Sequence, residues 1–352
     1  MDSFSSIPVM SMAPWRGASD ERRAFVDELR RACHEVGFFL LVDHGIEREW
    51  FDDYFALVRR FFALPDDVKA RIEKIGSAHF RGWERIGSEL TDNKVDFREQ
   101  VDCSTEWQPY PNGVEPAYLR IDGPNQWLPE DVLPGFRTGV LDFMARMGAI
   151  ADQLMRALAT SLDLPDDTFH VRFGERPHSL TKLISYPPTP RGMAGVNSHH
   201  DAGFLTLLVQ NGVSGLQAQN PDGDWIDVPP TPGTLVVNLG EMLQSMTGNY
   251  YVATTHRVIA TDPRLSVAYF HGPDLRAGLA PLELGPEFRR AVERSPRHRS
   301  AGFMATRDDL LAGESGTRAA SAGVFGQQLW NYYCRSYPAN VKRHHPDVFS
   351  GV

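Results

Sequence analysis

The chain has 352 residues, 42% of them hydrophobic and 23% charged, which is ordinary for a soluble globular protein of one large or two medium domains. The formal net charge of -9 argues against a nucleic-acid partner held by a general basic field. No run of about 18 apolar residues occurs, so we expect neither a membrane-spanning helix nor a membrane partner.

The three cysteines, Cys33, Cys103 and Cys334, lie far apart and match neither a zinc-ribbon spacing nor a disulfide framework. A sparse, odd set of this kind is typical of a reducing cytoplasm. The N-terminal residues also lack the basic region and the long apolar run of a signal peptide. We therefore expect a cytoplasmic protein, with a monomer as the default state.

The N-terminal part alternates between strand and helix patterns. Residues 7–10 are a short apolar run with a proline, which suits an edge strand. Ser19 is expected to cap a helix whose apolar residues recur at helical spacing, and Gly37 supplies its stop. Residues 38–42 are continuously apolar, which favours a buried strand, and a second helix with a broad aromatic face follows and ends before Pro65.

The middle of the chain changes character twice. Residues 76–130 are rich in Gly, Pro, Asn and Trp, and their prolines leave little room for long elements. From about Leu133 to Leu158 apolar residues recur every three or four positions. This stripe predicts a long helix that packs on a sheet rather than a cofactor-binding segment.

Beyond residue 165 the period changes from helix to strand. Short β-like runs separated by Gly, Pro, Asn and Asp predict a sandwich or barrel. The runs are residues 180–186, 204–210, 215–219, 225–228, 234–239, 250–259 and 265–271. Residues 295–323 are polar and expected to be a mobile excursion, and residues 324–337 predict a closing helix. The expected units are an N-terminal helical and mixed region, 1–165, and a core with the C-terminal helix, 166–352, acting together.

Two imidazoles and a carboxylate stand next to one of these apolar runs. In a strand, residues two apart share a face, so His199 and Asp201 point together while His200 points away. A His and an Asp at a strand end are two of the three protein ligands of a 2-His-1-carboxylate iron site. Taken alone, this stretch is equally compatible with a polar surface turn.

His256, in a later predicted strand of the same β region, is the candidate third ligand. Three facial ligands leave three coordination positions open, which oxygen activation with a bidentate cosubstrate requires. A closed tetrahedral site would instead suit structural zinc. Arg264 and Ser266 follow, two apart on one strand face, and a guanidinium with a hydroxyl binds a carboxylate well. Tyr186 could add a phenolic donor to the same anion.

The ordered motifs resemble the 2-oxoglutarate/Fe(II)-dependent oxygenases of the isopenicillin N synthase-like branch, over nearly the whole chain. The matching segments are VGFFLLVDHGI (36–46), FFALP (61–65), SYPP (185–188), HHDAG (199–203), VNLGEML (237–243), THRV (255–258) and RLS (264–266). The resemblance implies a double-stranded β-helix, a jelly-roll or cupin-like core, flanked by N-terminal helices of the non-heme dioxygenase type and a C-terminal helix.

The resemblance also implies a chemistry. Iron would be held by His199, Asp201 and His256, and the distal carboxylate of 2-oxoglutarate by Arg264 and Ser266 with help from Tyr186. With Fe(II), 2-oxoglutarate and O2, such an enzyme oxidises an unactivated C–H bond of a small-molecule substrate by hydroxylation, desaturation or cyclisation. Succinate and CO2 are released.

Two positions depart from the pattern of the family. Ile184 stands where many members have Asn, so one cosubstrate contact is missing or replaced, and Glu241 stands where Asp is usual, an exchange expected to be structural. Ile184 leaves open an iron oxidase of the isopenicillin N synthase or ethylene-forming type that does not use 2-oxoglutarate as an ordinary cosubstrate. A non-catalytic ligand-binding jelly-roll module is the alternative from another class.

The sequence does not name the substrate. Phe270 shares a predicted strand face with Ser266 and is expected to line the substrate pocket, together with Phe204, Leu205 and Arg98. Arg98 is equally expected to pair with neighbouring acids. Among the other histidines, His44 is expected to cap an element or lie in the core, whereas His344 and His345 are expected to be solvated.

Overall fold

The computed structural model describes residues 3–91, 94–295, 297–298 and 323–349. Its strands are β1 Val9–Ser11, β2 Phe38–Val42, β3 Gly82–Glu84, β4 Leu90–Thr91, β5 Lys94–Val95, β6 Glu99–Ser104, β7 Leu180–Tyr186, β8 Val196–His199, β9 Leu205–Gln210, β10 Leu216–Gln219, β11 Trp225–Asp227, β12 Leu235–Leu239, β13 His256–Val258 and β14 Arg264–His271. Its α-helices are α1 Ser19–Glu35, α2 Arg48–Phe62, α3 Asp66–Lys69, α4 Phe136–Ser161, α5 Thr168–Phe173, α6 Glu241–Met246, α7 Pro286–Arg294, α11 Phe325–Ser336 and α12 Pro338–His344.

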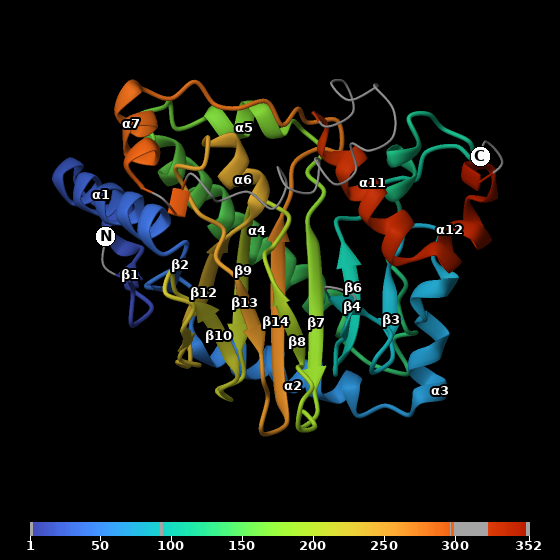
Figure 1. Cartoon of the computed structure of the whole chain (residues 1–352). Coiled ribbons are helices and arrows are strands. Elements are labelled where there is room, and N and C mark those ends of the chain that lie inside the picture. The colour runs from blue at the N-terminus through green and yellow to red at the C-terminus, as the bar shows by residue number, and fades with distance from the viewer. Residues whose placement is uncertain (1–2, 92–93, 296, 299–322, 350–352) are drawn as a thin grey trace.

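The large sheet is built from both halves of the chain. Its order is β1-β2-β12-β9-β14-β7-β6-β3, and the strands follow one another from left to right in Figure 1. The first two and the last two strands of this order come from the N-terminal part, and β1 pairs in parallel with β2 at one edge. The N-terminal part therefore completes the sheet of the core at both edges.

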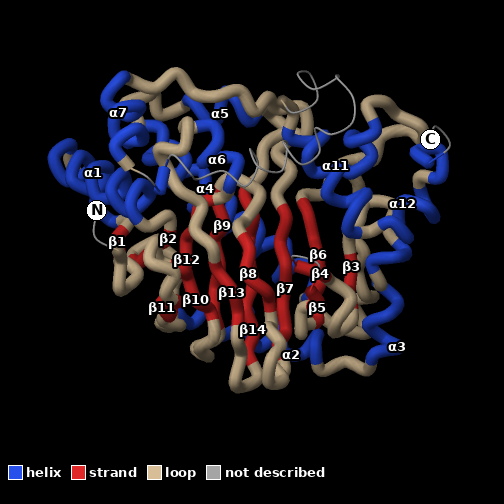
Figure 2. The backbone as a smooth tube through the Cα atoms, in the orientation of Figure 1, coloured by secondary structure: helices blue, strands red, loops and turns tan. Residues whose placement is uncertain are grey.

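A smaller sheet faces the middle of the large one. Its order is β11-β10-β13-β8, and Figure 2 shows the strands of both sheets gathered at the centre with helices around them. A cluster of buried apolar side chains joins the two sheets, with Ile184 and Tyr186 from β7 packed among Val196, Leu216 and Val258 from the small sheet. Two facing sheets with this interior form the expected double-stranded β-helix.

The other face of the large sheet packs against helices. Because side chains alternate along a strand, Leu205, Leu207 and Val209 of β9 point away from the interior and join the main hydrophobic core. Helix α4 contributes residues such as Met147 and Leu154 to the same core. Burying these side chains holds the sheet against α4 and leaves its opposite face available for the site.

Most predicted elements are confirmed, including the edge strand near residue 9, the strand 180–186 and the long helix, which runs from Phe136 to Ser161. The closing helix is observed as α11. Most of the expected excursion at 295–323 lies outside the described residues. Among the helices that the structure describes, none combines the length and the hydropathy needed to cross a membrane.

Three local expectations were wrong. Ala18, not Ser19, is the N-cap of α1, because Glu21 reaches back and its Oε2 accepts the Ala18 N–H at 3.1 Å. Of the strand expected at 250–259 only β13 forms, at residues 256–258. The residues before it do not pair in a sheet, and Tyr251 packs instead in the main hydrophobic core beside the helices, called the helix-side core below. The six-residue strand β6, Glu99–Ser104, lies inside a region expected to be irregular.

Candidate functional site

Three potential metal ligands converge at the end of the small sheet. His199 ends β8 and lies directly opposite His256, which begins β13. One ligand atom from each of His199, Asp201 and His256 lies within 4.8 Å of the other two. Asp201 and His256 are buried, so the group points into the interior between the sheets rather than into bulk water.

Hydrogen bonds behind the imidazoles set their orientation. His199 Nδ1 lies 2.8 Å from the carbonyl oxygen of Asn197, and His256 Nδ1 lies 3.0 Å from that of Thr254. A carbonyl can only accept, so each Nδ1 carries a proton, and the tautomer that fits has its lone pair on Nε2. Burial, and then the neighbouring His256, lower the pKa of His199 to about 3, so its ring is neutral near pH 7, as a metal ligand must be.

The carboxylate is held in the same way. Its Oδ2 accepts hydrogen bonds from Thr206 Oγ1 at 2.6 Å and Asn238 Nδ2 at 2.7 Å. Its Oδ1 is left facing both imidazoles, 3.6 Å from each Nε2. Although burial opposes it, the two histidines and these two donors keep the pKa of Asp201 below its usual value. Two imidazoles and one carboxylate, each supported from behind, fit a divalent first-row metal such as Fe(II).

The adjacent histidine has other partners. His200 Nε2 lies 2.9 Å from Thr255 Oγ1, and its Nδ1 lies 3.5 Å from Glu241 Oε1. The Glu241 backbone N–H also donates to the Asp201 carbonyl at 2.8 Å. Glu241 thus braces the loop that carries the two histidines and Asp201.

A second feature of the interior is a buried guanidinium. Arg264 is 1% exposed, and its two terminal nitrogens donate to neutral groups, Ser266 Oγ at 3.2 Å and Gln210 Oε1 at 2.9 Å. Its carbon Cζ lies 5.0 Å from the centre of the Tyr186 ring, and its Nε has no partner within the described residues. Burial lowers the pKa of Arg264. Among the described residues no carboxylate pairs with its guanidinium to offset the hydration that burial removes. A guest carboxylate would supply the missing charge.

Sheet register places the two features on the same side of the large sheet. Ser266 of β14 is opposite Gln210 of β9, and four residues further along β14 Phe270 is opposite Thr206, which holds Asp201. Residues directly opposite in an antiparallel pair share a face. The guanidinium and the triad therefore lie along one interior surface. Half-buried Phe270 lies at its triad end, and its role in lining the substrate pocket stays a prediction.

Three other expected pocket residues lie elsewhere. Phe204 packs its ring against Phe173 and Phe325 with centroids 4.8 and 6.1 Å apart, and Leu205 joins the helix-side core. Both therefore face away from the interior, which corrects the expectation that they line the pocket. Arg98 is held in ion pairs of 3.0 Å with Glu89 and 3.1 Å with Asp96, the outcome given as equally expected.

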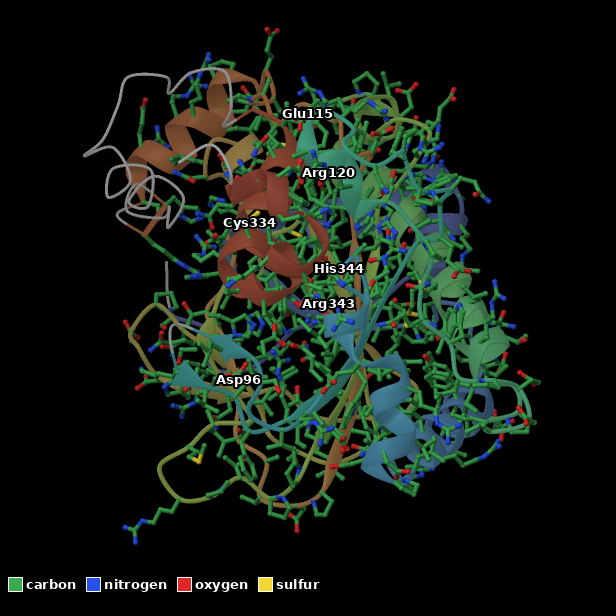
Figure 3. All side chains as sticks on the ribbon, turned by 90° about the vertical axis from the view of Figure 1, so that its right-hand side faces the viewer. Asp96, Glu115, Arg120, Cys334, Arg343 and His344 are labelled. Atoms are coloured by element: carbon green, nitrogen blue, oxygen red, sulfur yellow. The ribbon has the colours of Figure 1, made fainter. Side chains whose placement is uncertain are left out.

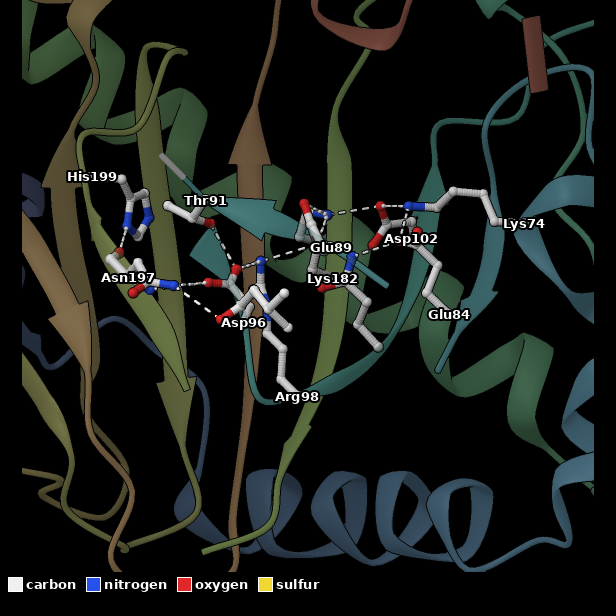
Figure 4. Close-up of polar contacts among 12 residues, drawn as sticks. Lys74, Glu84, Glu89, Thr91, Asp96, Arg98, Asp102, Lys182, Asn197 and His199 are labelled. Atoms are coloured by element: carbon white, nitrogen blue, oxygen red, sulfur yellow. Dashed lines mark hydrogen bonds and ion pairs between the residues drawn. The ribbon is translucent and has the colours of Figure 1, made fainter. Parts of the chain in front are cut away.

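A set of buried charges that the sequence did not predict lies beside this surface. We call it the charge network: Lys74, Glu84, Glu89, Asp96, Arg98, Asp102 and Lys182 (Figure 4). Asp102 of β6 is opposite Lys182 of β7, and Lys182 is opposite Ala268 of β14, so the network borders the same interior face. The alternation Gln100-x-Asp102-x-Ser104 was the available signal, but it resembles a solvated edge strand.

The other three histidines singled out from the sequence lie against backbone carbonyls. His44 is buried, with Nε2 2.9 Å from the Gly233 carbonyl, as expected. The expectation of solvated histidines at the C-terminal end was wrong. His344 Nε2 lies 2.9 Å from the Ile75 carbonyl, and His345, which is buried, lies 2.8 Å from that of Ala78. Figure 3 shows His344 and Cys334 on the C-terminal helices, which these bonds tie to the N-terminal part.

Comparisons with known proteins agree with this geometry. Residues 7–130 match the family described as "non-haem dioxygenase in morphine synthesis N-terminal", and residues 171–273 match the "2OG-Fe(II) oxygenase superfamily". The chain is 33% identical to "2-oxoglutarate-dependent dioxygenase frbJ" of Dothideomycetidae sp. (strain 11243), over 98% of this chain and 91% of that protein. It is 32% identical to "Homoarginine-6-hydroxylase 2-ODD-C23" of Glycine max, over 82% and 94%.

The fold is also similar to solved structures. A full-length Neurospora crassa protein, crystallised in complex with alpha-KG, superposes with a TM-score of 0.69, covering 82% of this chain and 93% of that one. The identity is 23%, so this likeness concerns the fold.

The bonds behind Asp201 lead to a first prediction. Asn238→Ala removes one of the two donors to Oδ2 and lets the carboxylate rotate, so the affinity for Fe(II) or Co(II) should fall about 10-fold. Anaerobic titration calorimetry measures this. Thr255→Val is the matched control, because it removes a hydrogen bond to His200 and leaves the contacts of Asp201 in place. Equal affinities in both variants would contradict the ligand geometry described above.

Proposed function

This chain belongs to the 2-oxoglutarate/Fe(II)-dependent oxygenase superfamily, and from that premise we propose that His199, Asp201 and His256 bind the catalytic Fe(II). The protein is an oxidoreductase that couples the oxidation of a small molecule by O2 to the conversion of 2-oxoglutarate into succinate and CO2. The observation that carries the assignment is the convergence of two oriented Nε2 atoms on Asp201 Oδ1. The same interior surface carries an arginine that lacks an acidic partner among the described residues.

When bound, Fe(II) supplies open coordination positions and the redox chemistry that oxygen activation requires. The residues of the chain supply orientation. Asn197 and Thr254 hold the imidazoles through their carbonyl groups, and Thr206 and Asn238 hold the carboxylate. The apolar side chains between the two sheets exclude water, which strengthens each of these polar contacts.

We propose that Arg264 and Ser266 bind the distal carboxylate of 2-oxoglutarate, with the Tyr186 ring against the guanidinium. The free Nε of Arg264 and the neutral character of its partners in the described chain support this assignment. Ile184, opposite Ser266, offers no hydrogen bond at the position where many members of the family have Asn. Cosubstrate binding therefore depends more heavily on Arg264.

The charge network supports a proposal about the substrate. It contains four carboxylates and three cations within the described residues, and Asp102 Oδ1 and Gln100 Oε1 are buried without a partner there. Buried acceptors and an excess of negative charge favour a substrate that brings donors and a positive charge. We therefore propose a small molecule with an ammonium or guanidinium group, the chemistry that the homoarginine hydroxylases among the relatives are named for.

One experiment in two stages tests the function. Under anaerobic conditions, Fe(II) followed by 2-oxoglutarate should give a visible charge-transfer band, and succinate should form once O2 is admitted. In the second stage, basic amino acids such as L-homoarginine should raise the rate of succinate formation more than thymine or an apolar amino acid does.

The outcomes separate the alternatives. Neither band nor succinate would contradict the assignment, and iron binding without 2-oxoglutarate consumption would favour the iron oxidase alternative. Stable binding of both ligands without any turnover would favour a non-catalytic module. Stimulation by apolar compounds alone would contradict the proposed substrate class only.

Arg264→Ala should raise the KM for 2-oxoglutarate by about 30- to 100-fold, since a charge-assisted contact worth about 2–3 kcal/mol is lost. Steady-state kinetics measure KM, and Fe(II) affinity should stay within about threefold of the unmodified protein. Arg257→Ala is the control: it removes an arginine from the neighbouring β13, where Arg257 donates to Gln217 and lies over Trp225. A collapse of iron affinity in Arg264→Ala would refute the cosubstrate role.

We also propose the finer features expected from the sequence. The protein is a monomer of the isopenicillin N synthase-like branch, with units 1–165 and 166–352. It works in the cytoplasm, without nucleic-acid or membrane partners. The free thiols of Cys33, Cys103 and Cys334 and the net charge of -9 support this description. Light scattering would test the monomer against the chain mass of 39.4 kDa.

A further inference from the structure

We propose that Asp96, from the N-terminal part of the chain, is a positioning residue for the iron ligand His199. The inference rests on the proposed function, because it takes His199 as a ligand. Asp96 lies outside the segment 171–273 that contains the triad and Arg264. It reaches His199 through a single intervening residue, Asn197.

The contacts form a short chain, drawn in Figure 4. Asp96 Oδ1 accepts two hydrogen bonds from Asn197, one from the backbone N–H at 3.1 Å and one from the side-chain Nδ2 at 2.9 Å. The carbonyl oxygen of Asn197 lies 2.8 Å from His199 Nδ1. Asp96 therefore holds both the backbone N–H and the side-chain amide of Asn197, whose carbonyl orients the His199 imidazole.

The position of β8 in the small sheet explains why His199 needs this support. His256 belongs to β13, which is paired with β10 on one side and β8 on the other. β8 is the last strand of that sheet, so in the described chain no further strand pairs with its outer backbone groups. Asp96 takes the place of that strand by accepting the outward N–H of Asn197. Without it, the outer side of Asn197 would keep only the longer contacts of its side-chain Nδ2 with the carbonyls of Lys94 at 3.4 Å and Val95 at 3.2 Å.

The charge network holds Asp96 in turn. Asp96 is completely buried, and its Oδ2 accepts from Thr91 Oγ1 at 2.7 Å and pairs with Arg98 at 3.1 Å. Arg98 pairs with Glu89, whose carboxylate lies 3.5 Å from Lys182. The ion pairs continue through Asp102 and Lys74, so the carboxylate of Asp96 is anchored across several strands.

The chemistry of the site requires a carboxylate. All four partners of Asp96, counting both Asn197 groups, are donors. A carboxylate accepts from each of them, whereas an amide would turn its own NH2 group toward one pair of donors. Asp96→Asn keeps nearly the same shape. It should nevertheless lose either the hydrogen bonds from Asn197 or the contacts with Thr91 and Arg98.

The test compares full-length Asp96→Asn with the unmodified protein. Its affinity for Co(II), measured by anaerobic titration, should fall about 10- to 100-fold, and the visible absorption of bound Co(II) should change because one imidazole is no longer held. kcat should fall more than the KM for 2-oxoglutarate rises. Asn197→Ala loses the side-chain bonds to Asp96, Lys94 and Val95 but keeps the backbone N–H that donates to Asp96. It should weaken Co(II) binding less, and it tests the same contact if Asp96→Asn does not fold.

Glu84→Gln is the matched control, because Glu84 is a buried member of the same network and pairs with Lys74. It should lower the melting temperature without changing Co(II) affinity or spectrum. Unchanged Co(II) binding and spectrum in Asp96→Asn and Asn197→Ala, or equal losses in Glu84→Gln, would overturn the positioning role alone. An unmodified protein that bound no Co(II) would overturn the proposed function and this inference together.

Discussion

The site depends on hydrogen bonds made behind the ligand atoms. Two imidazoles and a carboxylate approach one another in a buried interior, and each could rotate away if nothing held its far side. The carbonyls of Asn197 and Thr254 hold the proton-bearing nitrogens, while Thr206 and Asn238 hold the outer oxygen of Asp201. Because both Nε2 atoms and the remaining oxygen are then directed at one point, a metal bound there would meet ligands that are already oriented.

The second constraint is the cost of burying charge. Arg264 is buried without an acidic partner among the described residues, which costs free energy. In the function proposed above, a carboxylate that arrives with the cosubstrate offsets this cost. The charge network differs, because most of its charges are paired within the protein, and only an excess carboxylate and the unpartnered Asp102 Oδ1 are left for a ligand. One interior surface thus combines an arginine without an acidic partner in the described chain with ion pairs that give rigidity.

The two parts of the chain are linked by this surface. The N-terminal part closes the large sheet at both edges, and strand β6 brings Asp102 against Lys182 of β7. The loop that leads into β6 carries Asp96 to the outer edge of β8. The region that contains the candidate metal ligands is therefore shaped by a residue 101 positions earlier in the chain.

The sequence alone determined the features that follow from local periodicity: the strand and helix runs, the shared face of His199 and Asp201, and the opposite direction of His200. Tertiary structure decided which face of each strand packs against the helices and which faces the interior between the two sheets. Phe204 and Leu205 belong to a continuous apolar run that is buried on both sides, so its pattern could not distinguish the helix-side core from the interior. The buried polar strand β6 was hidden for a related reason. Its charges are stable only because partners distant in sequence, such as Lys182, neutralise them, and a period of two carries no information about those partners.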